Sequence, residues 1–416
     1  MASGDQVGAR AAEGAAAGPA PVTRSAGLRY LLALDGLRGI AIILVLFHNL
    51  TMTGDAKAPL VAQCLEAGWI GVQLFLVLSG YLITRNLLST DLSAPALKAF
   101  LIRRFLRIVP VCYVMLAIYF QVVPRLAVVP TIEATRHTQL WYWLFLSNWT
   151  EPLGVGAPGL GHLWSLGVEV QFYLLWPFVI LALGQRRIAH ACVAMIVAAF
   201  TFSVMLRLVG APPMAVYKFT ITRMNALATG ALVAVVAPRL DLRVPTRALA
   251  VATSAALLAI VVWRRSFDYA DAVVGTVGYV LIATLFGLWL LPIARSTSAP
   301  DDPARRNPAV TIPSARWLCS VGRVSYGMYV VHYPLHWFGL QVTYPRMLGK
   351  DGVIVEWKLA VYVVLASVAT YLLARVVWLA IERPILSLKR HVPPTGVRRP
   401  TLPLETLSSR GLLDRR

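Results

Sequence analysis

The sequence contains little charge, and this scarcity excludes most classes of soluble protein. Only 14% of its 416 residues are charged, whereas 58% are hydrophobic. An average soluble domain carries about 25% charged residues. Acidic residues are the rarer kind, with 19 Asp and Glu against 39 Lys and Arg. A soluble protein of this length needs a charged surface that this composition cannot supply, so we expect the lipid bilayer to be its main solvent.

Cysteine is also scarce, and its spacing argues against two kinds of stabilising site. The four cysteines, Cys64, Cys112, Cys192 and Cys319, are far apart and form no CxxC pair. Neither a disulfide framework nor a zinc site is therefore indicated, and we expect no bound metal. Residues 1–28 are rich in Ala and Gly and lack the apolar core of a cleavable signal peptide. We expect them to form a disordered cytoplasmic tail, with the first membrane segment as a signal anchor.

What the sequence does contain is a series of long apolar runs. A helix that crosses the hydrocarbon layer needs about 20 mostly apolar residues, and helices satisfy their own backbone hydrogen bonds there. The sequence therefore predicts an all-α integral membrane protein, with a membrane domain over residues 29–385 and a basic cytoplasmic tail over residues 386–416. We predict ten membrane-spanning helices, over residues 31–52, 69–88, 106–123, 163–183, 188–209, 219–237, 247–263, 272–293, 320–342 and 357–380.

The basic residues indicate how these helices are oriented. With ten spans, 26 of the 39 Lys and Arg residues fall on the side that holds both termini, and 11 fall on the other side. Cytoplasmic loops carry the excess of Lys and Arg, so both termini are predicted to be cytoplasmic. A nucleic-acid-binding protein would gather its basic residues on one face. The net charge of +20 is therefore interpreted as an orientation signal.

Ionisable residues inside the apolar runs are the first candidates for a functional site, because burying a charge in the membrane costs about a few kcal/mol or more. In the first run, Asp35 and Arg38 lie near the inner end. His48 follows about 15 Å further along the helix. Imidazole is suited to proton transfer near neutral pH, although His48 could equally be a packing or interfacial residue.

The fourth run begins with a second candidate cluster. Ser165 and Glu169 are four residues apart and share a helix face, and His162, three residues before Ser165, lies on the same side. A His, a Ser and a carboxylate placed together could form a proton-handling site. The alternative is that Ser165 or His162 caps the helix while Glu169 pairs with an Arg of another span.

Three further positions carry polar groups that need an explanation. Arg104 and Arg107 share a helix face at the predicted cytoplasmic edge, and guanidinium groups bind phosphates bidentately. The positive-inside rule alone would also place them there. Arg223, near Asn225, opens the sixth run, and His332 lies deep in the ninth. A histidine at that depth is either a satisfied core residue or a ligand contact.

Seven motifs occur in order over about residues 30–390: LDGLRG with a downstream His, FLVLSGYLIT, RRFLRIVP, HLWSLGVE followed by QFYLLWP, TRMNAL, SYGMYVVHYPL and IERP. In this order the sequence resembles the membrane acyltransferase 3 family. The resemblance implies about ten helices and the transfer of an acyl group, usually acetyl, from cytoplasmic acyl-CoA to a hydroxyl of a sugar, a glycan or a small natural product. It also implies that acyl-CoA is a donor substrate and that no cofactor is bound permanently.

The resemblance assigns roles to the polar residues singled out above. It implies that an Arg and a His of the first span, an Arg-x-x-Arg pair and a Ser-x-x-x-Glu pair are essential. We expect the histidine to take the acceptor's proton, the arginines to hold the donor, and the carboxylate to orient or charge-stabilise the imidazole. We expect His162, His332 and Arg223 to contact the acceptor. The remaining predicted site residues are His48, Glu169 and Ser165 for catalysis, and Arg38, Arg104 and Arg107 for the donor.

Two positions depart from the family pattern. The family has ten residues between the Arg and the His of the first span, whereas nine separate Arg38 from His48 in this sequence, and Asn49 takes the family's position. One residue turns a helix by about 100°, so His48 would need a local bulge, or a shift toward Arg38, to act as the family's histidine does. Asn225 stands where the family often has Asp.

The layout of the sequence favours one kind of acceptor. No esterase-type domain follows the ten predicted spans, and this layout resembles the short members that acylate macrolide and related antibiotics. We therefore predict a natural product, such as a macrolide or its sugar, as the acceptor. A cell-envelope polysaccharide or a lipid-linked sugar is the alternative. A transporter or flippase is the alternative class, because spans with buried polar groups also describe a substrate pathway.

Overall fold

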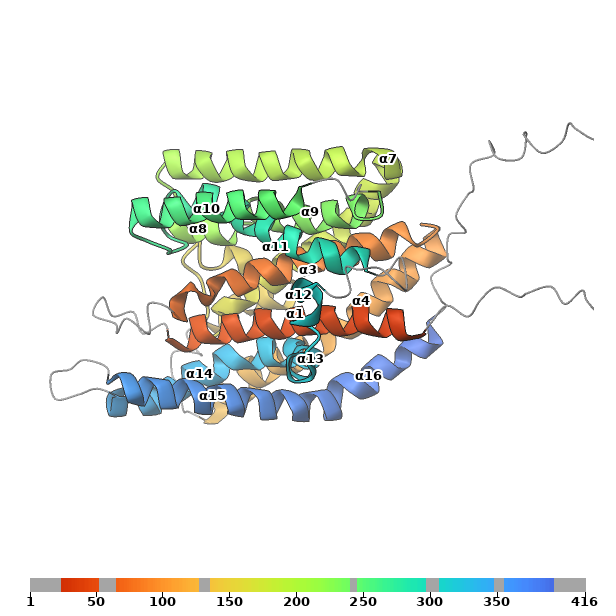
Figure 1. Cartoon of the computed structure of the whole chain (residues 1–416). Helices are drawn as coiled ribbons and strands as arrows, with labels where there is room; N and C mark the ends of the chain where they lie inside the picture. Colours follow the sequence, from red (N-terminus) through yellow and green to blue (C-terminus); the bar gives the residue numbers. More distant parts are fainter. Residues whose placement is uncertain are drawn as a thin grey trace, which may run out of the picture.

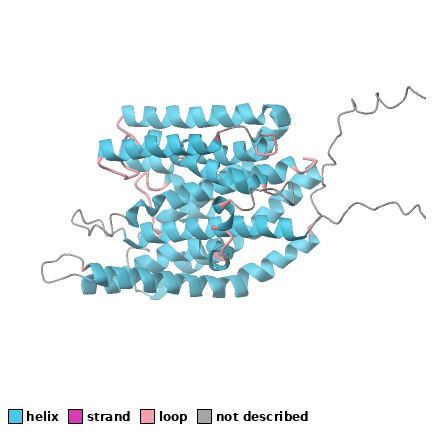
Figure 2. Cartoon of the chain, viewed as in Figure 1, coloured by secondary structure: helices cyan, strands magenta, loops and turns pink. Residues whose placement is uncertain are grey.

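Helices form every regular element of the structure. The computed structural model describes residues 24–51, 65–126, 135–239, 245–296, 307–347 and 355–392, and within these ranges no strand occurs (Figure 2). The predicted all-α class is therefore confirmed. Cys64, most of the predicted N-terminal tail and most of the predicted C-terminal tail lie outside the described residues.

The helices of the described residues divide into long and short ones. The long α-helices are α1 (Arg24–Thr51), α3 (Ile70–Leu88), α4 (Ala94–Ala117), α7 (Trp164–Leu208), α9 (Thr220–Val236), α10 (Thr246–Arg264), α11 (Tyr279–Arg295), α14 (Ser325–Met347) and α15 (Glu356–Val377). The shorter α-helices are α6 (Gln139–Trp143), α8 (Pro213–Lys218), α12 (Pro308–Thr311), α13 (Arg316–Arg323) and α16 (Arg383–Ser387). Single turns of 3₁₀-helix are η1 (Ala67–Trp69), η3 (Val123–Leu126), η4 (Arg136–Thr138), η5 (Ser147–Trp149), η6 (Gly161–Leu163) and η10 (Leu388–His391), and π-helical turns are η2 (Ile118–Val122), η7 (Val274–Gly278) and η9 (Trp378–Glu382).

Eight helical stretches of the described chain are long and apolar enough to cross a membrane. One of them, Gly161–Leu208, contains both the fourth and the fifth predicted spans, because α7 is broken at Gly184, where φ is 66° and ψ is 164°. The ninth predicted span coincides with α14, which is not among the eight. Each predicted run therefore coincides with a helix, while the count of ten crossings stays a prediction.

The third helix begins earlier than its apolar run. We predicted residues 106–123, whereas α4 begins at Ala94, directly after an extended Ser93 and with a Pro in its first turn. Proline is favoured in the first turn of a helix because its missing N–H would be unpaired there anyway. The hydropathy of the sequence did not reveal the first part of α4 as helix, because this part carries Lys98, Arg103 and Arg104. Arg104 and Arg107 consequently lie within one helix, α4.

The long helices lie roughly side by side, as Figure 1 shows. The start of α1 and the short helix α16 lie at the same end of this bundle (Figure 1), as an even number of crossings requires. Helix α13 is seen almost end-on in the same view, so it runs across the bundle. It packs against α1. The side of the membrane on which this end lies stays a prediction.

The core of the bundle forms where α3 and α9 cross. A Cβ on Gly80 would overlap the carbonyl of Leu227, and one on Gly230 would overlap the carbonyl of Val77. Glycine is therefore required at both positions, because within a membrane small residues allow the close helix packing that replaces the hydrophobic effect. At the periphery, α10 buries only Thr253 among its residues.

Candidate functional site

Two adjoining cavities bring together the predicted donor residues. The basic cavity, of about 520 Å³, lies between α1, α3, α4 and η10, and the inner cavity, of about 80 Å³, lies between α1, α3, α4, α7 and α14. Arg38, Leu82, Arg104 and Arg107 line both cavities. The structure therefore gathers the three arginines, which come from α1 and α4, at the junction of the two cavities.

The basic cavity has a strongly positive wall. In addition to the three junction arginines, Arg85, Arg103 and Lys389 line it, with the polar side chains of Asn86 and Ser89, and none of its described lining residues is acidic. Guanidinium and ammonium groups in this number create a potential that attracts an anion.

The junction arginines are held in different ways. The Arg38 guanidinium lies 3.2 Å from the Asp35 carboxylate, one turn away on α1. The Arg104 guanidinium lies 5.6 Å from the centre of the Phe100 ring. Arg107 forms no hydrogen bond or ion pair with another described residue. Its donors are consequently free to bind a ligand at the junction.

The inner cavity is polar on its α7 and α14 sides. Ser165 and Glu169 line it, as do Tyr326 and Tyr329. The Tyr329 hydroxyl donates to the His162 carbonyl at 2.5 Å and lies 2.6 Å from the Ser165 hydroxyl. Because the Tyr329 proton is engaged with that carbonyl, Ser165 donates to the Tyr329 oxygen. This geometry favours Ser165 as a hydrogen-bonding residue over Ser165 as a nucleophile, which would need a base beside it.

Both structural alternatives for this cluster are wrong. The N-cap of α7 is Leu163, and no side chain caps the helix, so neither Ser165 nor His162 has that role. Glu169 forms no ion pair with another described residue, although it shares the inner cavity with Arg38, Arg104 and Arg107. Its carboxylate is therefore available to a ligand or to water in the cavity.

His48 lies away from both cavities. Its Nδ1 atom is 2.7 Å from the Glu66 carbonyl oxygen, and its ring contacts the edge of Tyr269 at 6.0 Å between centroids. Nδ1 must carry the proton to bond a carbonyl, so the lone pair is on Nε2. We expected Glu169 to orient or charge-stabilise this imidazole; in the described structure the Glu66 carbonyl is the group that bonds and orients it.

The position of His48 follows from helix geometry. α1 is a continuous α-helix from Arg24 to Thr51, without the bulge that we considered. At about 100° per residue, the ten steps from Arg38 to His48 leave the two side chains about 80° apart around the axis. The eleven steps from Arg38 to Asn49 leave only about 20° between them. Asn49 is therefore the residue that shares the face of Arg38.

Asn49 is bonded to one of two histidines that the fold brings together. Its Nδ2 atom lies 2.9 Å from His332 Nε2, and His332 Nδ1 lies 2.7 Å from the Tyr329 carbonyl oxygen. The rings of His162 and His332 lie 5.0 Å apart. We predicted His162 on the side of Ser165; it lies in the 3₁₀ turn η6, and its ring lies 5.4 Å from the ring of Tyr329 of α14, whose hydroxyl bonds Ser165.

Arg223, which we expect to contact the acceptor, lies among aromatic rings. Its side chain is 1% exposed, and its guanidinium lies 4.1 Å from the Tyr279 ring centre and 4.4 Å from that of Tyr217. Its Nε donates to the Tyr217 carbonyl at 2.5 Å. Arg223 lines neither cavity, so its geometry is that of a packed cation between aromatic rings. The nearby Asn225 bonds the adjacent backbone amide.

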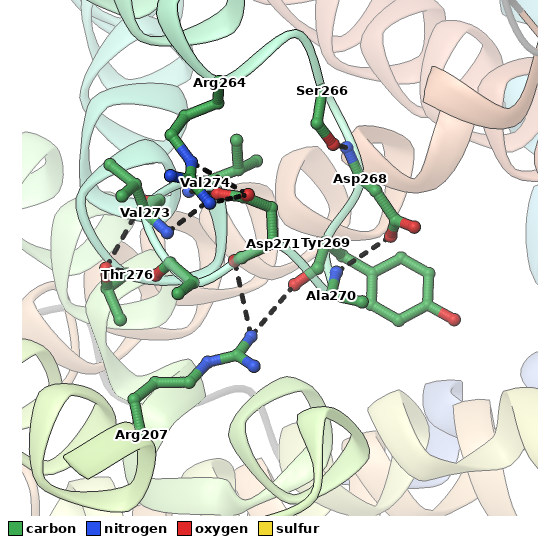
Figure 3. Close-up of polar contacts among 11 residues, drawn as sticks. Arg207, Arg264, Ser266, Asp268, Tyr269, Ala270, Asp271, Val273, Val274 and Thr276 are labelled. Carbon is green, nitrogen blue, oxygen red and sulfur yellow. Dashed lines mark hydrogen bonds and ion pairs between the residues drawn. The ribbon is translucent and has the colours of Figure 1, made fainter. Parts of the chain in front are cut away.

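The loop between α10 and η7, drawn in Figure 3, carries Tyr269, whose ring contacts His48. The Asp271 carboxylate binds the Arg264 guanidinium at 2.9 Å and accepts from the amides of Val273 and Val274. Arg207 of α7 approaches the Tyr269 and Asp271 carbonyls at 3.5 and 3.4 Å (Figure 3). Burial acts to raise the pKa of Asp271, but Arg264 and these amides outweigh it and lower the pKa below its ordinary value.

Several residues of this region were not singled out from the sequence. Lys218, although it is buried, forms an ion pair with Glu151 beside the Gly161 backbone. Glu382, which the sequence places in the IERP motif, is buried in the π-turn η9 with one carboxylate oxygen unpaired. The place of Lys218 directly before the sixth apolar run was a usable signal. No spacing connects Lys218 to Glu151, and Tyr329 was hidden within an aromatic motif.

The comparisons with known proteins agree on one activity. The family described as an acyltransferase domain matches residues 31–379. The chain is 28% identical over 382 residues to the peptidoglycan O-acetyltransferase OatA of Listeria monocytogenes, with 86% of this chain and 56% of the relative covered. It is 27% identical to the putative peptidoglycan O-acetyltransferase YrhL of Bacillus subtilis (86% and 55% covered) and 25% identical to the O-acetyltransferase OatA of Staphylococcus aureus (86% and 57% covered). The chain thus spans about half the length of these relatives. No solved structure shows significant similarity to it.

Proposed function

The chain belongs to the acyltransferase family whose domain matches residues 31–379, and from this premise we propose that it is an O-acetyltransferase that uses acetyl-CoA to acetylate a hydroxyl of a cell-envelope glycan. It is a multi-pass membrane protein. The proposal has three parts: the donor, the chemistry and the acceptor.

The junction of the two cavities is the observation that carries the proposal. Acyl-CoA has a phosphorylated nucleotide at one end and a thioester at the other, joined by a narrow chain. The basic cavity offers six cationic side chains to the phosphates, and the smaller inner cavity offers room for the thioester. Arg38, Arg104 and Arg107 stand where the two parts of the donor would meet. Bidentate guanidinium contacts suit phosphate oxygens.

The inner cavity contains the polar groups that acyl transfer needs. As the hydroxyl attacks the thioester carbonyl, negative charge develops on the carbonyl oxygen and needs nearby donors. Arg38 faces this space and would provide such donors, whereas the Ser165 proton is engaged with Tyr329. An imidazole has to accept the proton of the hydroxyl. His48, through Nε2, and His162, through Nδ1, each have a ring nitrogen that bonds no other described residue.

The relatives support a glycan as the acceptor. Those from Listeria monocytogenes and Bacillus subtilis are named as peptidoglycan O-acetyltransferases. They favour the cell-envelope alternative over the macrolide or other natural product that we predicted from the layout. We therefore propose a sugar hydroxyl of peptidoglycan, or of a closely similar glycan, as the group that receives the acetyl.

One experiment tests the whole proposal. The purified full chain in lipid nanodiscs is incubated with acetyl-CoA labelled in the acetyl group, with and without soluble peptidoglycan fragments, and products are followed by mass spectrometry. We expect CoA to be released in step with the appearance of acetylated fragments. Absence of both CoA release and acetylated product would reject the proposal and leave the transporter class, which needs no CoA site.

A further inference from the structure

One face of α3 runs along both cavities and shows how they follow one another. Over residues 71–84 every residue of α3 is buried except Phe75, Ser79 and Leu82, and all three line the inner cavity. Because the other faces of this stretch are buried, the exposed part of these three side chains faces the cavity. Leu82 lines the basic cavity as well, and the next lining residues of α3 in that cavity are Arg85, Asn86 and Ser89.

Phe75 lies at the end of the inner cavity that is farthest from the basic cavity. Seven residues of α3 lead from Leu82, at the junction, back to Phe75, a distance of about 10 Å along the helix axis at 1.5 Å per residue. No described residue of α3 that precedes Phe75 lines either cavity. We call this part of the inner cavity, where Phe75 meets Ser165 and Tyr329, the far end.

Two aromatic rings from different helices meet at the far end. The Phe75 ring of α3 lies 6.1 Å from the Tyr329 ring of α14, edge to face. The Tyr329 hydroxyl donates to the His162 carbonyl and accepts from the Ser165 hydroxyl, and these two bonds hold the Tyr329 ring in place. Both hydroxyl protons are engaged, so the far end has none to offer a ligand. It therefore suits an alkyl group better than a carbonyl oxygen.

We propose that the Phe75 and Tyr329 rings limit the length of the acyl group and so make the enzyme selective for acetyl over longer acyl chains. The inference rests on the proposed function, because it places the thioester in the inner cavity. With the phosphates in the basic cavity and the narrow chain at the junction, the alkyl end of the acyl group points to the far end. The small volume of the inner cavity, about 80 Å³ against about 520 Å³ for the basic cavity, supports a short acyl group.

The bonds that form and break are the same for every acyl group. The acceptor oxygen forms a bond to the thioester carbonyl carbon, the carbon–sulfur bond breaks, and the CoA sulfur leaves with the electron pair and ends with the hydroxyl proton. A longer chain differs only in its terminal carbons, which would overlap the Phe75 ring and hold the carbonyl carbon back from its position for attack. One methylene in a tight apolar pocket changes the rate by about 10- to 200-fold.

A competition between two donors tests the inference. The full chain in nanodiscs receives acetyl-CoA and butyryl-CoA at equal concentration, with soluble peptidoglycan fragments, and mass spectrometry gives the ratio of acetylated to butyrylated product. This ratio does not depend on how much of each variant is folded. For the wild type we expect acetyl to be preferred by about 10-fold or more. Phe75→Ala should lower the preference by about 10-fold or more, and Phe75→Leu, which removes less of the side chain, should lower it less.

Phe172→Ala is the matched control. Phe172 of α7 is 2% exposed, stacks on Trp176 and lines neither cavity, so its loss should leave the product ratio within twofold of the wild type. If Phe75→Ala does not fold, Phe75→Leu is judged by the same ratio. A wild type that transfers butyryl as readily as acetyl, Phe75 variants that keep the wild-type ratio, or an equal shift in Phe172→Ala would overturn the inference. A wild type that transfers neither acyl group would instead reject the proposed function.

Discussion

Replacement of Arg107 by Ala tests the junction of the two cavities most directly. Arg107 lines both cavities and bonds no other described residue, so its loss breaks no hydrogen bond or ion pair within the described chain. Arg38 and Arg104 carry like charges beside it. Removing the third charge relieves their repulsion, so the thermal stability of the empty variant should equal or exceed that of the wild type.

The effect on donor binding should have the opposite sign. A hydrogen bond to a charged group contributes about 1.5–3 kcal/mol, and each 1.4 kcal/mol is about tenfold in affinity. We therefore expect Arg107→Ala to weaken acetyl-CoA binding by about 10- to 150-fold. Arg107→Lys should show a smaller loss, because it keeps the charge but lacks the planar fork that binds phosphate at two points.

Isothermal titration calorimetry of the nanodisc-embedded chain with acetyl-CoA measures this change. Arg186→Ala is the matched control, since Arg186 is an exposed arginine that lines neither cavity. Acetyl-pantetheine, which lacks the nucleotide and its phosphates, should bind the wild type and Arg107→Ala equally. An acetyl-CoA affinity within twofold of the Arg186→Ala control, or a variant that melts well below the wild type, would refute the reasoning.

Three further outcomes follow from described contacts. Asn49→Leu should lower the free energy of unfolding by about 1–3 kcal/mol, because it leaves the buried Nε2 of His332 without its partner; an unchanged melting temperature would contradict this. Asp271→Ala should cost about 1 kcal/mol more than Asp271→Asn, because only Asn retains an oxygen for the two loop amides, as denaturant titration would show. Burial, and then the Asp268 charge, raise the pKa of the Glu66 carboxyl. Folding therefore disfavours its ionised form, and the wild type loses stability as pH rises from the ordinary pKa of a glutamate through the raised one. Glu66→Gln should raise the melting temperature at pH 7 relative to the wild type, and the gain should vanish near pH 4.

The parts of the site that depend on one helix could be predicted from the sequence. Arg104 and Arg107 were expected on one face, and the structure places them with Arg38 at the cavity junction. The 100° step also shows, without coordinates, that Asn49 shares the face of Arg38 and His48 does not. Residue type and spacing suffice here because a membrane helix is regular.

Contacts between helices could not be predicted in this way. The carbonyl that fixes His48 belongs to Glu66, and the ring that faces His162 belongs to His332. Such pairs depend on how the helices rotate and cross, and spacing within one run contains no information about that. The start of α4 was missed for another reason, because its first part is too polar to resemble a span although Ser93 and Pro95 mark where it begins.

The sparse burial along α10 has a consequence for how such a chain can change over evolutionary time. Because α10 places only Thr253 in the interior, most of its positions require only an apolar side chain. Leu, Val, Ile and Ala can replace one another there at little cost in stability. Positions where backbones touch, such as Gly80 and Gly230, have no such freedom. Sequence drift should therefore accumulate on the outer helix, while the residues around the two cavities change slowly.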